Sequence, residues 1–333
     1  MFDDERITWS IDGGGRFFFR PANKYSVTNV SGWMKVINND VLNSKFLFYV
    51  LSDLWKNKAY DYTKKAHPSV IRNEYIVPIP PIPIQQEIVS ILDNFTRLEA
   101  ELEAELEARK KQYDYYRNQL LTPKEIDGKW YLNGKEVEWK TLGDVCSISS
   151  GGTPSKSEKS YWLNGTIPWL KSEVCKEKLV FNSNDFIPQL GFQKSSAKLF
   201  SKNTTLIALV GATKCITAYL MFQSTTNQNI AGIKSRDEEQ LKDKFVFFYY
   251  MNQYQELIKN LGKYDMLNLG QIRGFKIPIP PIYEQERIVS ILDRFDALVN
   301  DISIGLPAEI AARRKQYEYY RGKLLTFKNR AEA

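Results

Sequence analysis

Apolar residues recur every three or four positions in two long stretches of the chain, and each stretch follows a proline-rich segment. In the first, the stripe runs from Ile88 to Leu120, and residues 84–122 contain neither proline nor glycine. This spacing predicts an amphipathic helix over residues 83–122, whose uninterrupted span 84–122 would be about 57 Å long at 1.5 Å per residue. So long and polar a helix cannot bury its stripe alone, so it needs a partner helix.

The second stretch, residues 283–326, carries a matching stripe and offers that partner. It holds four extra residues, about one helical turn, which keeps the stripe nearly in phase. Pro307, close after Gly305, should kink or restart the helix. A globular domain must lie between the helices, so we expect an antiparallel coiled coil. The residues expected in it are Ile88, Leu92, Phe95, Leu98, Leu102, Leu106, Tyr113, Tyr116, Ile288, Leu292, Phe295, Leu298, Tyr317 and Tyr320.

The two stretches also belong to an internal repeat. Residues 78–95 read PIPPIPIQQEIVSILDNF and residues 278–295 read PIPPIYEQERIVSILDRF. The match resumes as RKKQYDYYRNQLLT at 109–122 and RRKQYEYYRGKLLT at 313–326. Proline removes backbone donors and favours extended backbone, so each PIPPI segment is predicted to be an extended connector. The repeat indicates two similar halves.

The region between the two helices reads as a mixed domain of short strands, loops and helices. Residues 126–139 predict a hairpin that turns at Asn133-Gly134. Residues 204–210 predict a strand, and residues 244–251 predict a helix. The fold class is therefore α+β, with globular mixed α/β domains joined by two long helices.

Residues 1–77 partly match the last part of this domain. The pair Phe48-Tyr49 parallels Phe248-Tyr249, but nothing before Met1 matches residues 139–200. We therefore expect the first globular unit to lack its N-terminal half. The expected boundaries are 1–82 for a partial first domain, 83–122 for the first helix, 123–138 for a linker with the hairpin, 139–282 for a complete domain, 283–326 for the second helix and 327–333 for a tail.

The charge of the chain is concentrated in one domain. Of the net charge of +7, all lies in residues 139–282, which hold 18 Lys and Arg against 11 Asp and Glu. Such an excess is typical of a surface that binds a polyanion, although a merely basic, soluble surface would show it too. Polar loops of this domain supply candidate DNA contacts, because amides pair with base edges and lysines with phosphates. These candidates are Thr153, Ser155, Lys156, Lys171, Lys194, Thr213, Lys214, Asn227, Gln228, Asn229, Lys263 and Arg273.

The sequence offers little for catalysis. It has one histidine and three widely spaced cysteines, which argues against a metal site and favours a reducing cytoplasm. It shows neither a GxxxxGK[ST] phosphate loop nor a GxGxxG fingerprint, and no run of about 18 apolar residues. These features favour a soluble, cytoplasmic recognition or scaffold protein without catalytic or metal-binding residues.

Over essentially its whole length the chain resembles the specificity subunit of a type I restriction-modification system. The resemblance rests on the two PIPPI segments with their helices, on LGDVCSISSGGTPSK (142–156) and on IPWLKSEV (167–174). It implies two recognition domains that each read half of a split DNA site, and two helices that space them and dock methyltransferase subunits. Restriction subunits, which are translocase-nucleases, would join that complex. S-adenosylmethionine, ATP and magnesium would be bound by those partner subunits. Together with this chain, the partners would form an endonuclease and adenine methyltransferase complex.

Two features make this chain distinctive within the resemblance. Its unit Leu-Glu-Ala-Glu, repeated from Leu98, resembles the short repeats that set the spacer between half-sites, so deleting residues 99–102 should shorten the spacer by about one base pair. Its shortened first domain suggests a truncated or silent-cassette subunit. Such a subunit either reads DNA with residues 139–282, or acts only as a coiled-coil scaffold, or pairs as a homodimer on a near-palindromic site.

Overall fold

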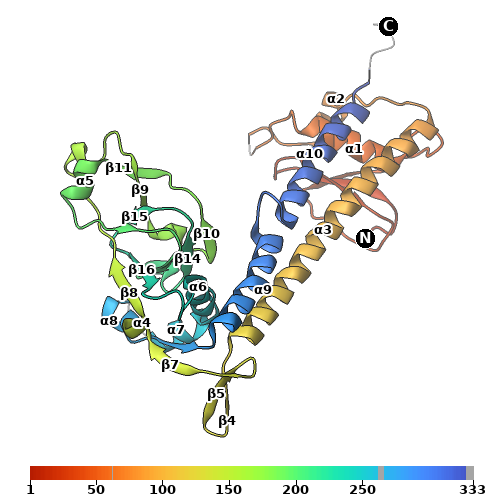
Figure 1. Cartoon of the computed structure of the whole chain (residues 1–333). Helices are drawn as coiled ribbons and strands as arrows, with labels where there is room; N and C mark the ends of the chain where they lie inside the picture. Colours follow the sequence, from red (N-terminus) through yellow and green to blue (C-terminus); the bar gives the residue numbers. More distant parts are fainter. Residues whose placement is uncertain (62, 262–265, 328–333) are drawn as a thin grey trace. The chain divides into compact units, whose positions relative to one another are not determined.

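The computed structural model describes residues 1–61, 63–261 and 266–327. The chain divides into two compact units. Unit 1 contains residues 1–106 and the chain from residue 302 onward, and unit 2 contains residues 107–301. The long helix α3 (Ile82–Leu121), orange to yellow in Figure 1, gives its first part to unit 1 and its last part to unit 2.

Unit 1 is built on a small antiparallel sheet with strand order β2-β1-β3. Its core packs Ile7, Trp9 and Phe17 of the sheet against Leu47 and Leu51 of the first helix. Its elements apart from α3 are β1 (Arg6–Ser10), β2 (Phe17–Arg20), β3 (Ser31–Met34), α1 (Ser44–Trp55), α2 (Pro68–Glu74) and α10 (Leu306–Leu324).

The helices of unit 1 pack in antiparallel fashion. Phe95 of α3 contacts Tyr317 and Tyr320 of α10, with ring centroids 6.3 and 5.5 Å apart. One turn further along α3, Glu99 accepts a 2.5 Å hydrogen bond from Arg314, which lies earlier in α10. Advancing along α3 therefore means going back along α10, which is the antiparallel arrangement expected for two helices with a globular domain between them.

Unit 2 contains the two larger sheets. The five-stranded sheet has the order β10 (Lys178–Val180), β14 (Thr217–Leu220), β13 (Thr204–Ala208), β16 (Ile230–Ser235) and β8 (Cys146–Ser150). The four-stranded sheet has the order β11 (Asp185–Ile187), β9 (Ile167–Leu170), β15 (Ser224–Thr226) and β12 (Leu199–Phe200). Smaller pairings are β17 (Lys276–Ile279) with β7 (Glu138–Thr141), and the meander β4 (Lys124–Ile126), β5 (Lys129–Leu132) and β6 (Lys135–Glu136).

The helices of unit 2 cover and connect these sheets. Helix α6 packs on β13 and β14 and against α9, and β13 and α6 confirm the strand and the helix predicted there. The hairpin between β5 and β6 turns at Asn133 and Gly134, both with positive φ, as Asn-Gly predicts. The helices are α4 (Leu142–Val145), α5 (Gln189–Gln193), α6 (Asp243–Asn252), α7 (Tyr254–Leu261), α8 (Leu269–Arg273) and α9 (Ile282–Asn300), with 3₁₀ turns η1 (Lys159–Tyr161), η2 (Ser172–Val174) and η3 (Gly211–Thr213).

The second long helix is interrupted earlier than its sequence predicts. It forms two helices, α9 and α10, rather than one helix over 283–326. Helix α9 already ends at Asn300, and Pro307 lies in the first turn of α10, where a missing N–H costs nothing. The four extra residues therefore do not form an added helical turn; the chain leaves the helix between Asn300 and Leu306.

Hydrogen bonds show which elements of the two units correspond. The N–H of Ile11 donates to the Val30 carbonyl at 2.8 Å, and the N–H of Leu209 donates to the Asn229 carbonyl at the same distance. Strands β2, β1 and β3 therefore correspond to β14, β13 and β16. Helix α1 begins at Ser44 and α6 at Asp243, an offset of 199. The sequence comparison paired Phe48-Tyr49 with Phe248-Tyr249, an offset of 200, and that pairing was wrong by one residue.

Candidate nucleic-acid interface

Three polar loops of unit 2 meet at one end of the five-stranded sheet, where β13 ends and β16 begins. The Leu209 N–H donates to the Asn229 carbonyl, which joins the loop after β13 to the loop before β16. The Gly152 N–H donates to the Thr226 carbonyl at 2.8 Å, which adds the loop after β8. The sheet thus gathers residues 151–156, 209–214 and 226–229, which hold most of the predicted contacts.

Two tryptophans fix the loop after β8. The Trp169 Nε1–H donates to the Gly152 carbonyl, and the Trp162 Nε1–H donates to the Ser155 carbonyl, each at 3.0 Å. The two rings meet edge to face, with centroids 5.1 Å apart. A Cβ at Gly152 would lie 2.4 Å from the backbone carbon of Ser196, so only glycine fits. The sequence names this loop but not the tryptophans that hold it, because their contacts cross different segments.

The structure brings several predicted residues together on this loop cluster. The Thr153 hydroxyl donates to the Gln228 side-chain oxygen, across two loops that are 75 residues apart. Ser155 and Lys156 are exposed beside them, and so is Gln228. These side chains place hydroxyls, an amide and a cation at one edge, which is the mixture that reads bases and holds phosphates.

Asn227 and Asn229 play different parts in the same cluster. The Asn227 side-chain oxygen accepts the Asn229 N–H at 3.1 Å, and the Asn227 N–H donates to the Leu170 carbonyl. Asn227 is only 9% exposed, so in this structure its side chain shapes the turn rather than faces solvent. Asn229 is half-buried, as are Thr213 and Lys214 in and after the 3₁₀ turn η3.

The remaining predicted cations lie in different settings. Lys171 ion-pairs with Asp185 at 2.8 Å, and this hydrogen bond raises the pKa of Lys171. Lys194 is exposed directly after α5. Arg273 is exposed at the end of α8, and its guanidinium donates to the Ile148 carbonyl in β8 at 3.5 Å. Lys263 lies outside the described residues.

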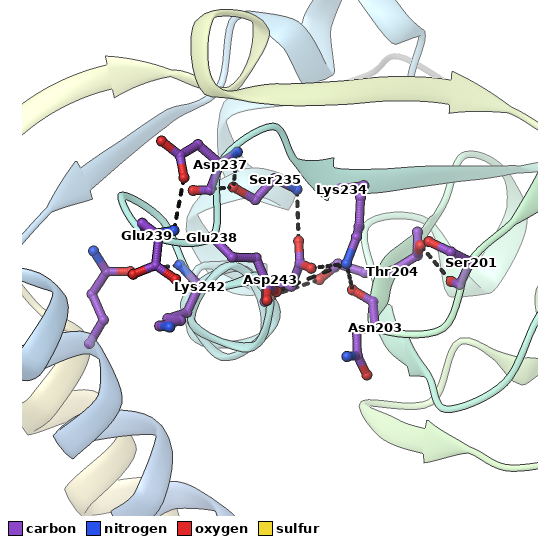
Figure 2. Close-up of polar contacts among 12 residues, drawn as sticks. Ser201, Asn203, Thr204, Lys234, Ser235, Asp237, Glu238, Glu239, Lys242 and Asp243 are labelled. Carbon is purple, nitrogen blue, oxygen red and sulfur yellow. Dashed lines mark hydrogen bonds and ion pairs between the residues drawn. The ribbon is translucent and has the colours of Figure 1, made fainter.

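A polar network that the sequence does not single out joins this domain to α9. Figure 2 shows Lys234 pointing to Asp243, the first residue of α6, whose carboxylate also accepts the Ser235 N–H at 2.7 Å. Burial, followed by a hydrogen bond with Glu238, raises the pKa of Asp243 to about 7. The network fixes the loop before α6, and in that loop the Gln240 carbonyl and the Lys242 N–H both bond the side chain of Gln285.

The predicted helix contacts divide between the units. In unit 1, Ile88 and Leu92 are buried beside α1, and Leu102 and Leu106 are half-buried. In unit 2, Phe295 stacks on Tyr113 and Tyr116, with centroids 6.1 and 5.5 Å apart. Ile288 and Leu292 of α9 are buried, whereas Leu98, Leu298 and Tyr320 stay partly exposed.

Reactive groups are held in unreactive settings among the described residues. Burial raises the pKa of the Cys146 and Cys175 thiols to about 12, and that of Cys215 to about 11. Within the described ranges, no three His, Cys, Asp or Glu side chains gather as a metal site. In the same part of the chain, no helix is long and apolar enough to span a bilayer.

Comparisons with known proteins agree with this architecture. The model of the type I restriction modification DNA specificity domain matches residues 1–108 and 134–312. The EcoR124I/EcoR124II specificity subunit of Escherichia coli is 38% identical over 330 residues, 93% of this chain and 78% of that protein. A putative type I specificity subunit of Haemophilus influenzae is 32% identical over 96% of this chain and 78% of its own length. The crystal structure of a type I S subunit from M. genitalium matches with a TM-score of 0.61 at 14% identity, over 99% of this chain and 85% of that one.

Proposed function

Since this chain belongs to the type I restriction-modification DNA specificity family, we propose that the loop cluster of unit 2 reads one half of a split DNA target. The cluster is residues 151–156, 209–214 and 226–229. The observation that carries the proposal is the hydrogen bond from Gly152 to Thr226, because it unites two polar loops beside Lys156 in the most basic part of the chain.

The helices supply the second part of the proposal. Helix α3 is continuous over 40 residues, long enough to set a fixed spacing along DNA. Its packing against α10 in unit 1 and against α9 in unit 2 supports a role as a spacer. We propose that the exposed sides of these helices dock methyltransferase subunits, and that restriction subunits join that complex in the cytoplasm.

The chemistry of the complex is assigned to the partners. S-adenosylmethionine would serve methyl transfer on the methyltransferase subunits, and ATP and magnesium would serve the restriction subunits. The protein described here would position the DNA and would not itself catalyse a step. The buried, protonated cysteines are consistent with that role.

Methylome sequencing tests the proposal. The chain is expressed with type I methyltransferase subunits in a host without other adenine methylation, and the modified sites are mapped. We expect methylation whose sequence changes when residues 226–229 are exchanged for those of a relative. A complex that forms but leaves the DNA unmethylated, with no salt-dependent binding to duplex DNA, would favour the scaffold role instead.

A further inference from the structure

Three strands from one contiguous segment of unit 2 pair with the edges of three other strands in the same domain. Strand β7 pairs with β17 in the connector, β8 pairs with β16, and β10 pairs with β14. All three donors lie within residues 138–180. The central strands β14, β13 and β16 thus become interior to a five-stranded sheet.

The three acceptor edges have counterparts in unit 1. Strand β2 corresponds to β14 and β3 to β16, because both sets flank equivalent central strands. Residues 76–79 correspond to β17, since PIPPI at 78–82 repeats PIPPI at 278–282. The bridge between Phe2 and Tyr25 repeats the pairing of Phe200 with Ser224, so the match includes Phe2.

These three edges of unit 1 are open within the described residues. Strands β2 and β3 pair only with β1 there, and residues 76–79 form no strand. Phe18 of β2 is 41% exposed, whereas its counterpart Ala218 is fully buried. Ile79 in the connector is 58% exposed. Unpaired edges with exposed apolar side chains are templates for strand addition.

We propose that unit 1 binds, by strand addition to these three edges, a polypeptide segment patterned like residues 138–180. One strand would pair antiparallel with β3 as β8 does with β16, and another parallel with β2 as β10 does with β14. A third would convert residues 76–79 into a strand. The proposed binding of the segment rests on the structural equivalence of the two units. A role of the completed unit in reading DNA would rest, in addition, on the proposed function.

The ladder geometry identifies the backbone groups that the added strand would use. Along an antiparallel ladder, pairs of residues that are hydrogen-bonded to each other alternate with pairs that are not. Because the Ile11 N–H bonds the Val30 carbonyl, Gly32 and Met34 of β3 also bond β1, and the N–H of Trp33 points away from β1. The counterpart of Trp33 at the offset of 199 is Gly232, which pairs with Ser149 of β8. Trp33 therefore provides a test position at which the β1–β3 ladder is not involved.

Hydrogen exchange on the full chain tests the proposal directly. A polypeptide of residues 138–198 of this protein, fused to a soluble carrier, is added in trans, and carrier alone is the control. In a second format, the same residues are fused to the N-terminus of the full chain. A separate polypeptide that cannot fold alone would then not decide the result. We expect the amides of Trp33 and Phe19 to exchange at least about tenfold more slowly with the segment than with carrier. Unchanged exchange in both formats would overturn the proposal.

Matched variants separate backbone pairing from side-chain contact. Trp33→Ala removes the ring but keeps the N–H, whereas Trp33→Pro removes the outward N–H and leaves the ladder to β1 intact. We expect Trp33→Pro to bind the segment about tenfold more weakly than Trp33→Ala. Equal binding by the two variants, or edges already protected in a dimer of the chain alone, would contradict it. Neither result depends on DNA, so failure here is distinguishable from failure of the proposed function.

Discussion

Gln85 and Gln285 make the same three hydrogen bonds in the two units. The Gln285 amide donates to the carbonyls of Gln240 and Pro280 and accepts the Lys242 N–H, all at 2.9 Å. The Gln85 amide does the same at 2.7 to 2.9 Å with Val41, Pro80 and Asn43. Each glutamine thus ties three backbone groups, from the connector and from the loop before the domain helix, to the start of a long helix.

Replacing Gln285 with leucine should destabilise the protein. The side chain is fully buried, so its loss leaves three backbone groups without partners, at a cost of about 1–3 kcal/mol or more. Urea unfolding measures the change, and Gln85→Leu should show a similar loss. Gln86→Leu, one residue further on the exposed side of the same helix, is the matched control and should change stability little. A loss as large in Gln86→Leu as in Gln85→Leu would mean that the bonds do not matter.

The sequence predicts much of the fold but not these contacts. The stripes from Ile88 and Ile288 predict the long helices because a local period is visible in the chain itself. Gln85 and Gln285 stand at equal places in the repeat, yet two of the three partners of each lie 42 to 45 residues earlier and show no pattern. The early end of α9 at Asn300 also has no breaker residue at that position. The candidate loops were predicted, but their meeting depends on long-range pairing of β13, β16 and β8.

The buried carboxyl of Asp243 should make stability depend on pH. Its folded pKa is raised to about 7 from an ordinary value of 3.8, so the folded state holds the proton more tightly. The resulting stabilisation is complete below about pH 4 and is lost as pH rises through 7. Asp243→Asn mimics the protonated form, so its stability should change less than that of the natural protein between pH 5 and 8. Asp237→Asn, at an exposed neighbour, should keep the natural pH profile in urea unfolding.

Lys156 should contribute one phosphate contact to DNA binding. It is exposed in the loop cluster, whereas Lys202 is exposed before β13, at the opposite end of that strand. Lys156→Ala should weaken binding and lower the slope of log K against log salt by about 0.9, the value for one released counterion. Lys202→Ala is the control and should leave the slope unchanged. Equal slopes for all three proteins would remove Lys156 from the interface.

Gly152→Ala should disable the loop cluster. Its Cβ would meet the backbone of Ser196 and Ala197 at 2.4 and 2.6 Å, and backbone cannot yield as a side-chain end can. We expect a destabilisation of about 1–3 kcal/mol and loss of specific DNA binding. Gly322→Ala is the contrasting change, because nothing lies near that position in α10 and alanine favours a helix by about 1 kcal/mol. Thermal unfolding and DNA titration of both variants check the pair.

Deleting residues 99–102 should shorten the spacer of the DNA target while preserving the helix contacts of unit 1. Arg314 bonds Glu99 and Glu103, each at 2.5 Å, and the four-residue repeat then puts Glu103 and Glu107 in their places. The helix loses roughly 6 Å, so methylation mapping should show a spacer shorter by about one base pair. Deleting only residues 99–101 places leucines opposite Arg314 and should impair assembly. An unchanged spacer after the four-residue deletion would show that α3 does not set the distance.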